Sequence, residues 1–573
     1  MELKKFFDNF ELLADAPNGV QKLRELILQL AVQGKLVPQN PDDEPASVLL
    51  EKIKEEKERL IKEGKIKKSK KLPPVDVGEV AFKLPKSWEW VRFDSICNQI
   101  TDGAHHTPTY TITGIPFLSV KDISSGIIDL SNTRYISEET HKKLIARCKP
   151  EFHDVLLTKV GTTGIGKVID VDIEFSIFVS LALLKFTQNL LSPYYLELVI
   201  NSPLVKEQSQ KNTQGIGNKN LVLKHIKNFI FPLPPLAEQH RIVIKVDALM
   251  KLCDELETRQ QKKRDRILKL GQVATTKLIT PSTPESFNQH WKPISDNFDL
   301  LYSTPENVSQ LRQTILQLAV MGKLVPQNPD DEAASVLLEK SKKEKERLIK
   351  EGKIKKSKKL PPVDVGEMAF DLPKGWEWVR LNEITIFGPR NGYSPKPVEY
   401  VTSVKTLTLS ATTSGKFDSQ HFKYIDKQIE PNSHLWLENE DLLIQRANSL
   451  EYVGVAAIYK GKAKEFIYPD LMMKIRFPKY LSIDYLYQTI NSKSSRRFLR
   501  ERASGTSGSM PKINQLTVNS LPIPLPPLTE QHRIVTKVDA MMKLCDELEA
   551  KLTQSISDRD KLMSAAVRQV LAT

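Results

Sequence analysis

The chain has 573 residues, of which 40% are hydrophobic and 27% charged, and its formal net charge is +14. This length allows roughly four domains of ~150 residues, and the composition is typical of folded globular protein. No apolar run reaches the ~18 residues of a membrane span. The N-terminus lacks the apolar core of a secretory signal, and the four cysteines form no Cys-x-x-Cys pair. A cytoplasmic protein without a disulfide framework or zinc ribbon is therefore expected.

The positive charge is concentrated in two lysine runs. Lys62–Lys71 and Lys350–Lys359 each contain six lysines and one glutamate, for +5 each. A polyanionic partner is one interpretation, and a solvated, flexible basic hinge is the other. Net charge alone therefore does not establish binding to nucleic acid.

The chain is a tandem repeat in which shared blocks alternate with unlike ones. Two blocks return unchanged, 288 residues later: Gly34–Glu44 as Gly322–Glu332, and Glu56–Glu79 as Glu344–Glu367. A third block, Leu233–Glu257, returns with few changes as Leu525–Glu549, 292 residues later. We therefore expect six segments: helical blocks with basic linkers at 1–85 and 296–373, variable domains at 86–232 and 374–524, and long helices at 233–295 and 525–573.

The shared blocks predict helices. The first carries an apolar stripe at helical spacing, repeated in its copy: Val20, Leu23, Ile27 and Leu30, and Val308, Leu311, Ile315 and Leu318. The block after each Pro-Pro has apolar residues at alternating spacings of four and three, as in Ile242, Val246, Leu249, Cys253 and Leu256. This spacing predicts a coiled-coil seam between paired long helices, with an ordinary amphipathic core helix as the alternative. Cys253 and Cys545 lie in the seam and are expected to be small core residues.

The variable blocks predict mixed α/β domains. Strands are expected at Asp154–Thr158 and Phe175–Phe186, and at Asp441–Ile444 and Leu471–Phe477. A helix is expected near the end of each block, at Tyr195–Asn201 and Tyr485–Asn491. The predicted fold class is thus α/β (α+β): two mixed domains separated by paired long coiled-coil helices, with a pseudo-two-fold internal repeat.

No catalytic motif is complete. Gly161–Lys167 imitates a phosphate-binding loop, but Val168 stands where a magnesium-binding Ser or Thr is required, and the following segment resembles a strand. Pro41-Asp42 with Glu55-Glu56-Lys57 imitates a nuclease site, yet Glu55 is Lys343 in the second copy. The chain has no Asn-Pro-Pro-Tyr and no Gly-x-Gly-x-x-Gly stretch. We therefore expect no catalytic residues and no metal site.

The combination of motifs resembles the specificity subunits of type I restriction–modification systems. Three features carry the resemblance: Leu-Pro-Pro-Leu-x-Glu-Gln-His-Arg-Ile at Leu233–Ile242 and Leu525–Ile534, Leu-Pro-x-x-Trp-x-Trp at Leu84–Trp90 and Leu372–Trp378, and the loop Asp102–Pro108. The second variable block lacks that loop and has Gly388–Pro395 instead. The resemblance spans nearly the whole chain.

The resemblance implies a non-catalytic subunit that binds double-stranded DNA. Each variable block would read one half of a split, asymmetric target, and the shared helices would bind two methyltransferase subunits, joined by two motor-nuclease subunits. S-adenosylmethionine, ATP and Mg²⁺ would belong to those partners, with no cofactor in this chain. The alternatives are a divergent restriction or methylation enzyme, and a coiled-coil scaffold that does not bind DNA.

Residues that could read DNA follow from the chemistry of the bases. Arg suits guanine, Asn or Gln suits adenine, and phosphates accept from Lys, Arg, hydroxyl or backbone donors. The first candidates lie in the entry loop of each variable block, where ordinary turn chemistry is the alternative. They are Thr101, His105, His106, Thr107 and Tyr110 in one block, and Arg390, Asn391, Tyr393, Ser394 and Lys396 in the other.

The favoured candidates follow a predicted strand. Asp154–Lys159 aligns with Asp441–Arg446, so a basic residue, Lys159 or Arg446, occupies the same position in each block. The residues after it differ between the blocks, as expected where the two targets differ: Thr162 and Thr163, against Asn448 and Ser449. A surface charge at a strand end is the alternative.

Two further segments near the end of each block are candidates. A glycine-rich loop could approach phosphates closely or be a plain turn; its residues are Gln214, Asn218 and Lys219, and Ser507, Ser509 and Lys512. Lys493–Arg502 is rich in arginine, and Arg496 and Arg500 are four residues apart, so they share one helix face. This cluster could contact phosphates, a partner or only solvent.

Overall fold

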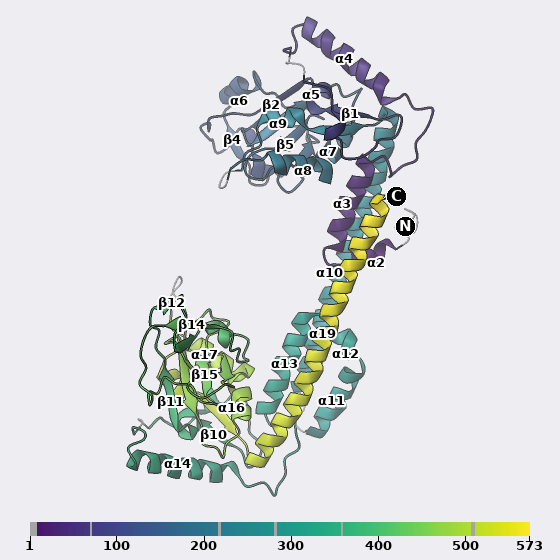
Figure 1. The fold of residues 1–573 in the computed structure, drawn as a ribbon. Coiled ribbons are helices and arrows are strands. Elements are labelled where there is room, and N and C mark those ends of the chain that lie inside the picture. The colour runs from purple at the N-terminus through teal and green to yellow at the C-terminus, as the bar shows by residue number, and fades with distance from the viewer. Residues whose placement is uncertain are drawn as a thin grey trace. The chain divides into compact units, whose positions relative to one another are not determined.

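The computed structural model describes residues 9–68, 72–215, 219–279, 284–356, 359–505 and 510–572. The chain divides into two compact units, Met1–Lys262 with Ile556–Thr573, and Lys263–Ser555. Two long helices, α10 (Leu236–Ile279) and α19 (Leu528–Ala572), contribute residues to both units (Figure 1). None of the helices in the described residues combines the length and the hydrophobicity of a membrane span.

The first unit has a helical part built around α3 (Gly19–Val32), beside α2 (Phe10–Ala14) and the exposed α4 (Ala46–Lys62). The predicted stripe of α3, from Val20 to Leu30, is buried. Helix α10 runs antiparallel to α3, because Gln39 and Arg24 contact Glu238 and Asp254 in reverse order. The end of α19 lies beside α3 (Figure 1) and supplies Met563, Ala566 and Val570 to the same core. A segment from the far end of the chain therefore completes the first helical core.

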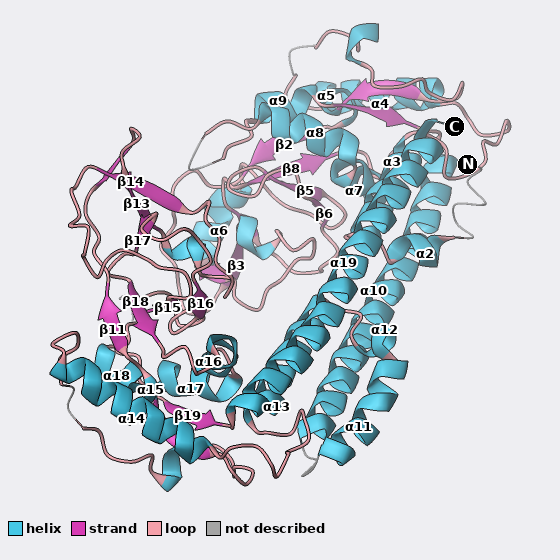
Figure 2. Cartoon of the chain, turned by 60° about the horizontal axis from the view of Figure 1, so that its bottom comes forward, coloured by secondary structure: helices cyan, strands magenta, loops and turns pink. Residues whose placement is uncertain are grey.

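The α/β domain of the first unit contains two small sheets and a closing strand pair. One sheet has the order β2-β8-β5-β6 (Figure 2). The other has the order β4-β3-β7, and β1 pairs with β9 antiparallel. The strands are β1 (Glu89–Arg92), β2 (Gln99–Asp102), β3 (Ile115–Leu118), β4 (Arg134–Ile136), β5 (Val155–Thr158), β6 (Gly166–Val168), β7 (Ser176–Ile177), β8 (Leu181–Lys185) and β9 (Ile230–Leu233). The helices are α5 (Phe93–Ile96), α6 (Glu138–Ile145), α7 (Pro193–Asn201), α8 (Pro203–Asn212) and α9 (Leu223–Asn228), with 3-10 turns at Val77–Glu79 and Val120–Asp122.

The second unit repeats this plan. Its helical part contains α11 (Pro284–Asp296), α12 (Phe298–Leu301), α13 (Pro305–Val320) and α14 (Ala334–Lys350). Its domain has sheets β11-β18-β15-β16 and β12-β14-β13-β17, closed by β10 with β19. The strands are β10 (Glu377–Arg380), β11 (Phe387–Asn391), β12 (Pro397–Val398), β13 (Val404–Leu407), β14 (Phe422–Ile425), β15 (Leu442–Gln445), β16 (Ala456–Ile458), β17 (Phe466–Ile467), β18 (Met472–Arg476) and β19 (Pro522–Leu525). The domain helices are α15 (Leu381–Ile384), α16 (Ile483–Ile490), α17 (Lys493–Glu501) and α18 (Gln515–Asn519), with 3-10 turns at Val365–Glu367 and Leu409–Ala411.

The mixed α/β prediction for both variable blocks is confirmed, with one correction. The single strand expected at Phe175–Phe186 is two strands, β7 and β8, in different sheets. The chain turns between them, where Leu181 N donates to Phe178 O. In addition, β6 covers the end of the imitated phosphate loop and pairs with β5, so a strand stands where a nucleotide-binding loop requires a helix.

The long helices are paired, as predicted, since Met563 and Val570 of α19 pack in the core that contains the seam of α10. The predicted contact between the two seams needs correction. The seam residues of α10, including Val246 and Cys253, belong to the core of the first unit, whereas those of α19, including Val538 and Cys545, belong to the second. The repeated seams therefore do not pack against each other. The reason is that α3 and α13 supply their own apolar stripes, and each fills the seam of the long helix in its own unit.

The repeated motif at the start of each long helix forms a junction with the α/β domain. The Glu238 carboxylate accepts hydrogen bonds from Trp88 Nε1 at 2.9 Å and from Gln39 Nε2 at 2.6 Å. Gln239 Oε1 accepts from Ser192 N at 3.0 Å. The second unit makes the same bonds with Glu530, Trp376, Gln327, Gln531 and Ser482. The residues that recur between the copies are thus those that join domain to helix.

Candidate nucleic-acid interface

The entry loop of the first domain leaves strand β2 under tight steric control. A Cβ on Gly103 would lie 1.9 Å from Ile177 O, so only glycine fits there. Ala104 N donates to the same carbonyl at 2.9 Å. The contacts of Gly103 and Ala104 with Ile177 hold the base of the loop, while His105, His106 and Thr107 beyond it are exposed. The loop therefore presents three polar side chains from a fixed base.

The Asp102 carboxylate organises this loop. Asp102 is only 3% exposed and receives Arg147 Nη2 at 2.7 Å and His105 Nε2 at 3.0 Å on Oδ1. Lys159 Nζ approaches Oδ2 at 3.1 Å. A buried carboxylate needs such partners, because burial without them is costly. Three segments far apart in sequence are thereby fixed to one another.

Lys159, favoured from the sequence, lies in the domain interior. Its side chain is 6% exposed and its ammonium is paired with Asp102. A contact between Lys159 and DNA stays a prediction, and it requires this ion pair to open. In this structure the residue is a partner of the entry loop. Thr101 is also buried, in strand β2. The Arg134 guanidinium lies over the Tyr110 ring, with its Cζ atom 4.4 Å from the ring centre.

The loop after β5 and the glycine-rich loop of the first domain lie side by side. Gly161 N donates to Lys219 O at 2.9 Å, and the hydroxyls of Thr163 and Thr213 are 3.1 Å apart. Thr162, Gln214 and Lys219 are exposed. Asn218 lies outside the described residues. The structure thus brings the predicted second and third segments together.

The second domain builds its entry loop differently. Arg390 lies exposed on β11, opposite Lys474 of β18, and its carbonyl accepts from Tyr468 Oη at 3.1 Å. Asn391 is half-buried. Asp470 N donates to Ser394 Oγ at 3.0 Å, while Tyr393 and Lys396 are exposed.

The segment after β15 meets the other candidate loops. Arg446 Nη1 donates to Asp470 O at 3.3 Å, and Asn448 Nδ2 donates to Gln445 Oε1 at 2.7 Å. The exposed Lys512 pairs with Ala447 in a single bridge, and Ser449 is exposed. Ser507 and Ser509 lie outside the described residues. Arg446 is half-buried, unlike Lys159, so the aligned basic residues differ in access to solvent.

A buried lysine, missed from the sequence, lies beneath the entry loop of the second domain. Lys474 is fully buried, donates to Trp436 O at 2.7 Å and faces Asp441 at 3.4 Å. Burial lowers the pKa of Lys474 to about 8, against the opposing effect of Asp441. Lys474 lies within the strand predicted at Leu471–Phe477, and no sequence pattern marked it as a candidate. Each domain therefore has a buried lysine–aspartate pair, formed by residues that do not correspond.

The predicted arginine cluster of α17 does not act as one surface. Arg496 Nη1 and Nη2 donate to the carbonyls of Val453 and Glu451, and burial lowers the pKa of Arg496 to about 9, with Arg500 adding to the effect. Arg500 Nη2 donates to the same Glu451 carbonyl at 2.8 Å. These two residues share a helix face, as predicted, but they use it to bind a protein loop. Their contact with DNA stays a prediction.

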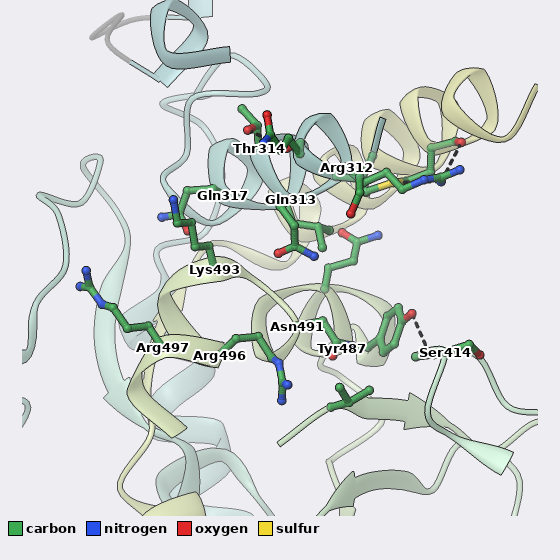
Figure 3. Close-up of a pocket in the computed structure, with 18 of the residues that line it drawn as sticks. Arg312, Gln313, Thr314, Gln317, Ser414, Tyr487, Asn491, Lys493, Arg496 and Arg497 are labelled. Atoms are coloured by element: carbon green, nitrogen blue, oxygen red, sulfur yellow. Dashed lines mark hydrogen bonds between the residues drawn. The ribbon is translucent and has the colours of Figure 1, made fainter. Parts of the chain in front are cut away.

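Helix α17 borders a cleft of about 1290 Å³ (Figure 3), and Arg496 and Arg500 are among the residues that line it. Lys493 and Arg497 lie on one side of it, and Arg312, Gln313 and Gln317 of α13 on the other. Ser494 N donates to Gln317 Oε1 at 3.1 Å, which joins the two helices. Arg312 is already paired with Asp546 and Glu549 of α19. The cleft is thus a polar joint between the α/β domain and the helical part of the second unit.

Comparison with known proteins assigns the family. Residues 85–264 and 373–558 match the model of the type I restriction modification DNA specificity domain. The chain is 33% identical to the EcoEI specificity subunit of Escherichia coli, over 93% of this chain and 91% of that protein. It is 35% identical to the EcoAI specificity subunit of Escherichia coli, over 96% and 94%. The chain therefore belongs to the specificity subunits of type I restriction–modification enzymes, which are non-catalytic parts of the complex.

A solved structure supports the fold assignment. The match comes from a study of complex assembly and conformational transition in the type I restriction–modification system. It covers 86% of this chain and 99% of the other, with a TM-score of 0.51 and 16% identity. At that identity the likeness concerns the fold alone.

Proposed function

We propose that this chain recognises a bipartite, asymmetric DNA target, with one half read by each α/β domain. The observation that carries the proposal is that identical junctions hold domains with different reading loops. Trp88 and Trp376 make the same bond to the long helices, whereas the entry loops share neither sequence nor internal contacts. Each domain would therefore be attached to its long helix in the same way, while the DNA sequence that it recognises differs.

The reading surface of each domain would combine its entry loop, the loop after β5 or β15, and its glycine-rich loop. These are the segments in which exposed polar side chains gather, including His106 and Thr162 in one domain and Arg390 and Ser449 in the other. Major-groove recognition needs such side chains on a rigid support.

The same proposal includes the partners. Two methyltransferase subunits would bind the helical parts, and two motor-nuclease subunits would complete the enzyme in the cytoplasm. S-adenosylmethionine, ATP and Mg²⁺ would be bound by those subunits. The chain would then supply sequence recognition to a reaction carried out by others.

A domain exchange tests the bipartite reading. Replacing Lys374–Ile523 with a second copy of Lys86–Phe231 keeps both junctions, because the β1–β9 and β10–β19 pairs have the same register. The assembled complex should then methylate a target whose two halves have the same sequence. The measurement is the methylated motif in host DNA, with the unexchanged complex as control. Persistence of the original two-part motif would refute the proposal.

A further inference from the structure

One exposed cation in the first domain is held by a buried carboxylate. Arg147 follows helix α6, and its side chain is 55% exposed, while that of Asp102 is 4% exposed. The Arg147 Nη2 atom donates to Asp102 at 2.7 Å and lies 3.1 Å from His105 Nε2. Among the described residues, Nε and Nη1 of Arg147 donate to no protein acceptor. Nη2 has two hydrogens and gives one to Asp102, so its second hydrogen and one of these two atoms form an edge with two parallel donors. The guanidinium is therefore fixed at one corner and keeps further donors available to a ligand.

Arg147 differs from the other cation on the same carboxylate. Lys159 is 6% exposed and lies in the interior, so only Arg147 offers its charge at the surface. Its neighbour His105 belongs to the exposed entry loop. A planar guanidinium that is oriented before binding loses little conformational freedom on forming two parallel hydrogen bonds. This arrangement suits recognition of a base edge better than a loose contact with phosphate.

We propose that Arg147 is a specificity-determining residue of the first domain, donating to the O6 and N7 atoms of a guanine in the first half-site. Asp102 is its positioning residue and also orients His105. The inference rests on the proposed function and adds the base and the side chain that reads it.

The test uses the assembled complex carrying Arg147→Gln or Arg147→Lys. Binding is measured to duplexes in which each base pair of the first half-site is changed in turn. We expect about 10- to 100-fold weaker binding to the cognate duplex, because a bidentate base contact has that value. At one G·C pair the variants should no longer discriminate, while discrimination in the second half-site stays as in the wild type. Lysine should fail like glutamine, because it cannot form the planar pair.

Lys143→Gln is the matched control. The substitution removes the same charge one helical turn earlier. Among the described residues, Lys143 pairs only with the exposed Glu139. It should leave the motif unchanged. If an Arg147 variant loses the same binding affinity for every duplex, Arg147 contacts phosphate and the proposal is overturned. Unchanged discrimination between the duplexes would overturn it as well. If the wild-type complex itself ignores changes in the first half-site, the proposed function fails instead.

Asp102→Asn tests positioning. It should relax discrimination at the same G·C pair as Arg147→Gln, and the double variant should be no less discriminating than either single variant. Thermal unfolding of each variant separates this effect from loss of the fold. Additive losses of discrimination would show that Asp102 does not act through Arg147. If Asp102→Asn does not fold, the Arg147 variants still decide the proposal.

Discussion

At the scale of residues, ion pairs join the helical block of each unit to the start of its long helix. Arg241 of α10 pairs with Asp43 at 2.5 Å, and Arg533 of α19 pairs with Asp331 at 2.5 Å. Hydrogen bonding from Arg241 holds the pKa of Asp43 below its ordinary value of 3.8, and Arg533 does the same for Asp331. The carboxylates are nearly buried while the arginines are about one-third exposed, so solvent screens the pairs in part.

Asp43→Asn should lower the free energy of unfolding of the first unit by about 1 kcal/mol at pH 7. A carboxyl whose pKa is lower in the folded state stabilises the fold fully above its unfolded value of 3.8. That contribution disappears as the pH falls through the lower, folded pKa, so variant and wild type should converge in acid. Chemical denaturation of the full chain across this range measures the difference.

Asp42→Asn is the control, because Asp42 is exposed and forms no ion pair within the described ranges. It should change stability little at either pH. A deficit in Asp43→Asn that persists unchanged in acid would contradict the electrostatic explanation.

At the scale of elements, the long helices close the chain on itself. The last residues of α19 lie beside α3, where Lys35 Nζ donates to Leu571 O at 2.8 Å and Lys22 pairs with Asp560. The end of α10 does the same in the second unit, where Lys323 Nζ donates to Ile279 O at 2.9 Å. Each helical core therefore contains one long helix near its start and the other near its end.

Met563→Ala should destabilise the first unit by about 2–5 kcal/mol, although the residue lies near the end of the chain. Met563 is fully buried in the core that contains α3. Leu562→Ala provides the matched control, because Leu562 is 53% exposed and should cost less than about 0.5 kcal/mol. Hydrogen exchange of the α3 amides is the measurement. If Met563→Ala speeds hydrogen exchange in α13 but not in α3, Met563 does not stabilise the core of the first unit and the prediction is wrong.

At the scale of the whole molecule, the two α/β domains belong to one continuous chain. Both α10 and α19 pass from one unit into the other. If they set the distance between half-sites, their length should determine the number of unread base pairs between the halves.

Inserting four helix-forming residues after Lys262 and four after Ser555 tests this idea at the boundaries of the units. Four residues add about 6 Å of helix, which is nearly two base pairs at about 3.4 Å each. The methylated motif should gain one or two spacer base pairs while both half-sites stay the same. Replacing four residues at each position without lengthening is the control. An unchanged spacer would show that the helices do not measure distance.

The sequence by itself determined the repeat, the class of each block and the family. Burial of side chains within one helix or strand appears directly in its local sequence. It produces the 3.6-residue periodicity of α3 and α13 and the apolar runs of β5 and β15. The nearly identical blocks Leu233–Glu257 and Leu525–Glu549 also predicted equivalent long helices in both halves, but their role as junctions appeared only in the structure.

Only the tertiary structure decided which helix fills each seam and which cations face solvent. The seam of α10 packs against α3. Which apolar surface covers a seam depends on all the helices that could pack there, and one helix's sequence does not show this. Lys159 and Arg147 carry the same charge, yet one is buried and the other exposed, because Asp102 joins segments 45 and 57 residues away. Such long-range pairing leaves no periodic signal in the chain, so the candidate reading residues could be grouped only once the fold was known.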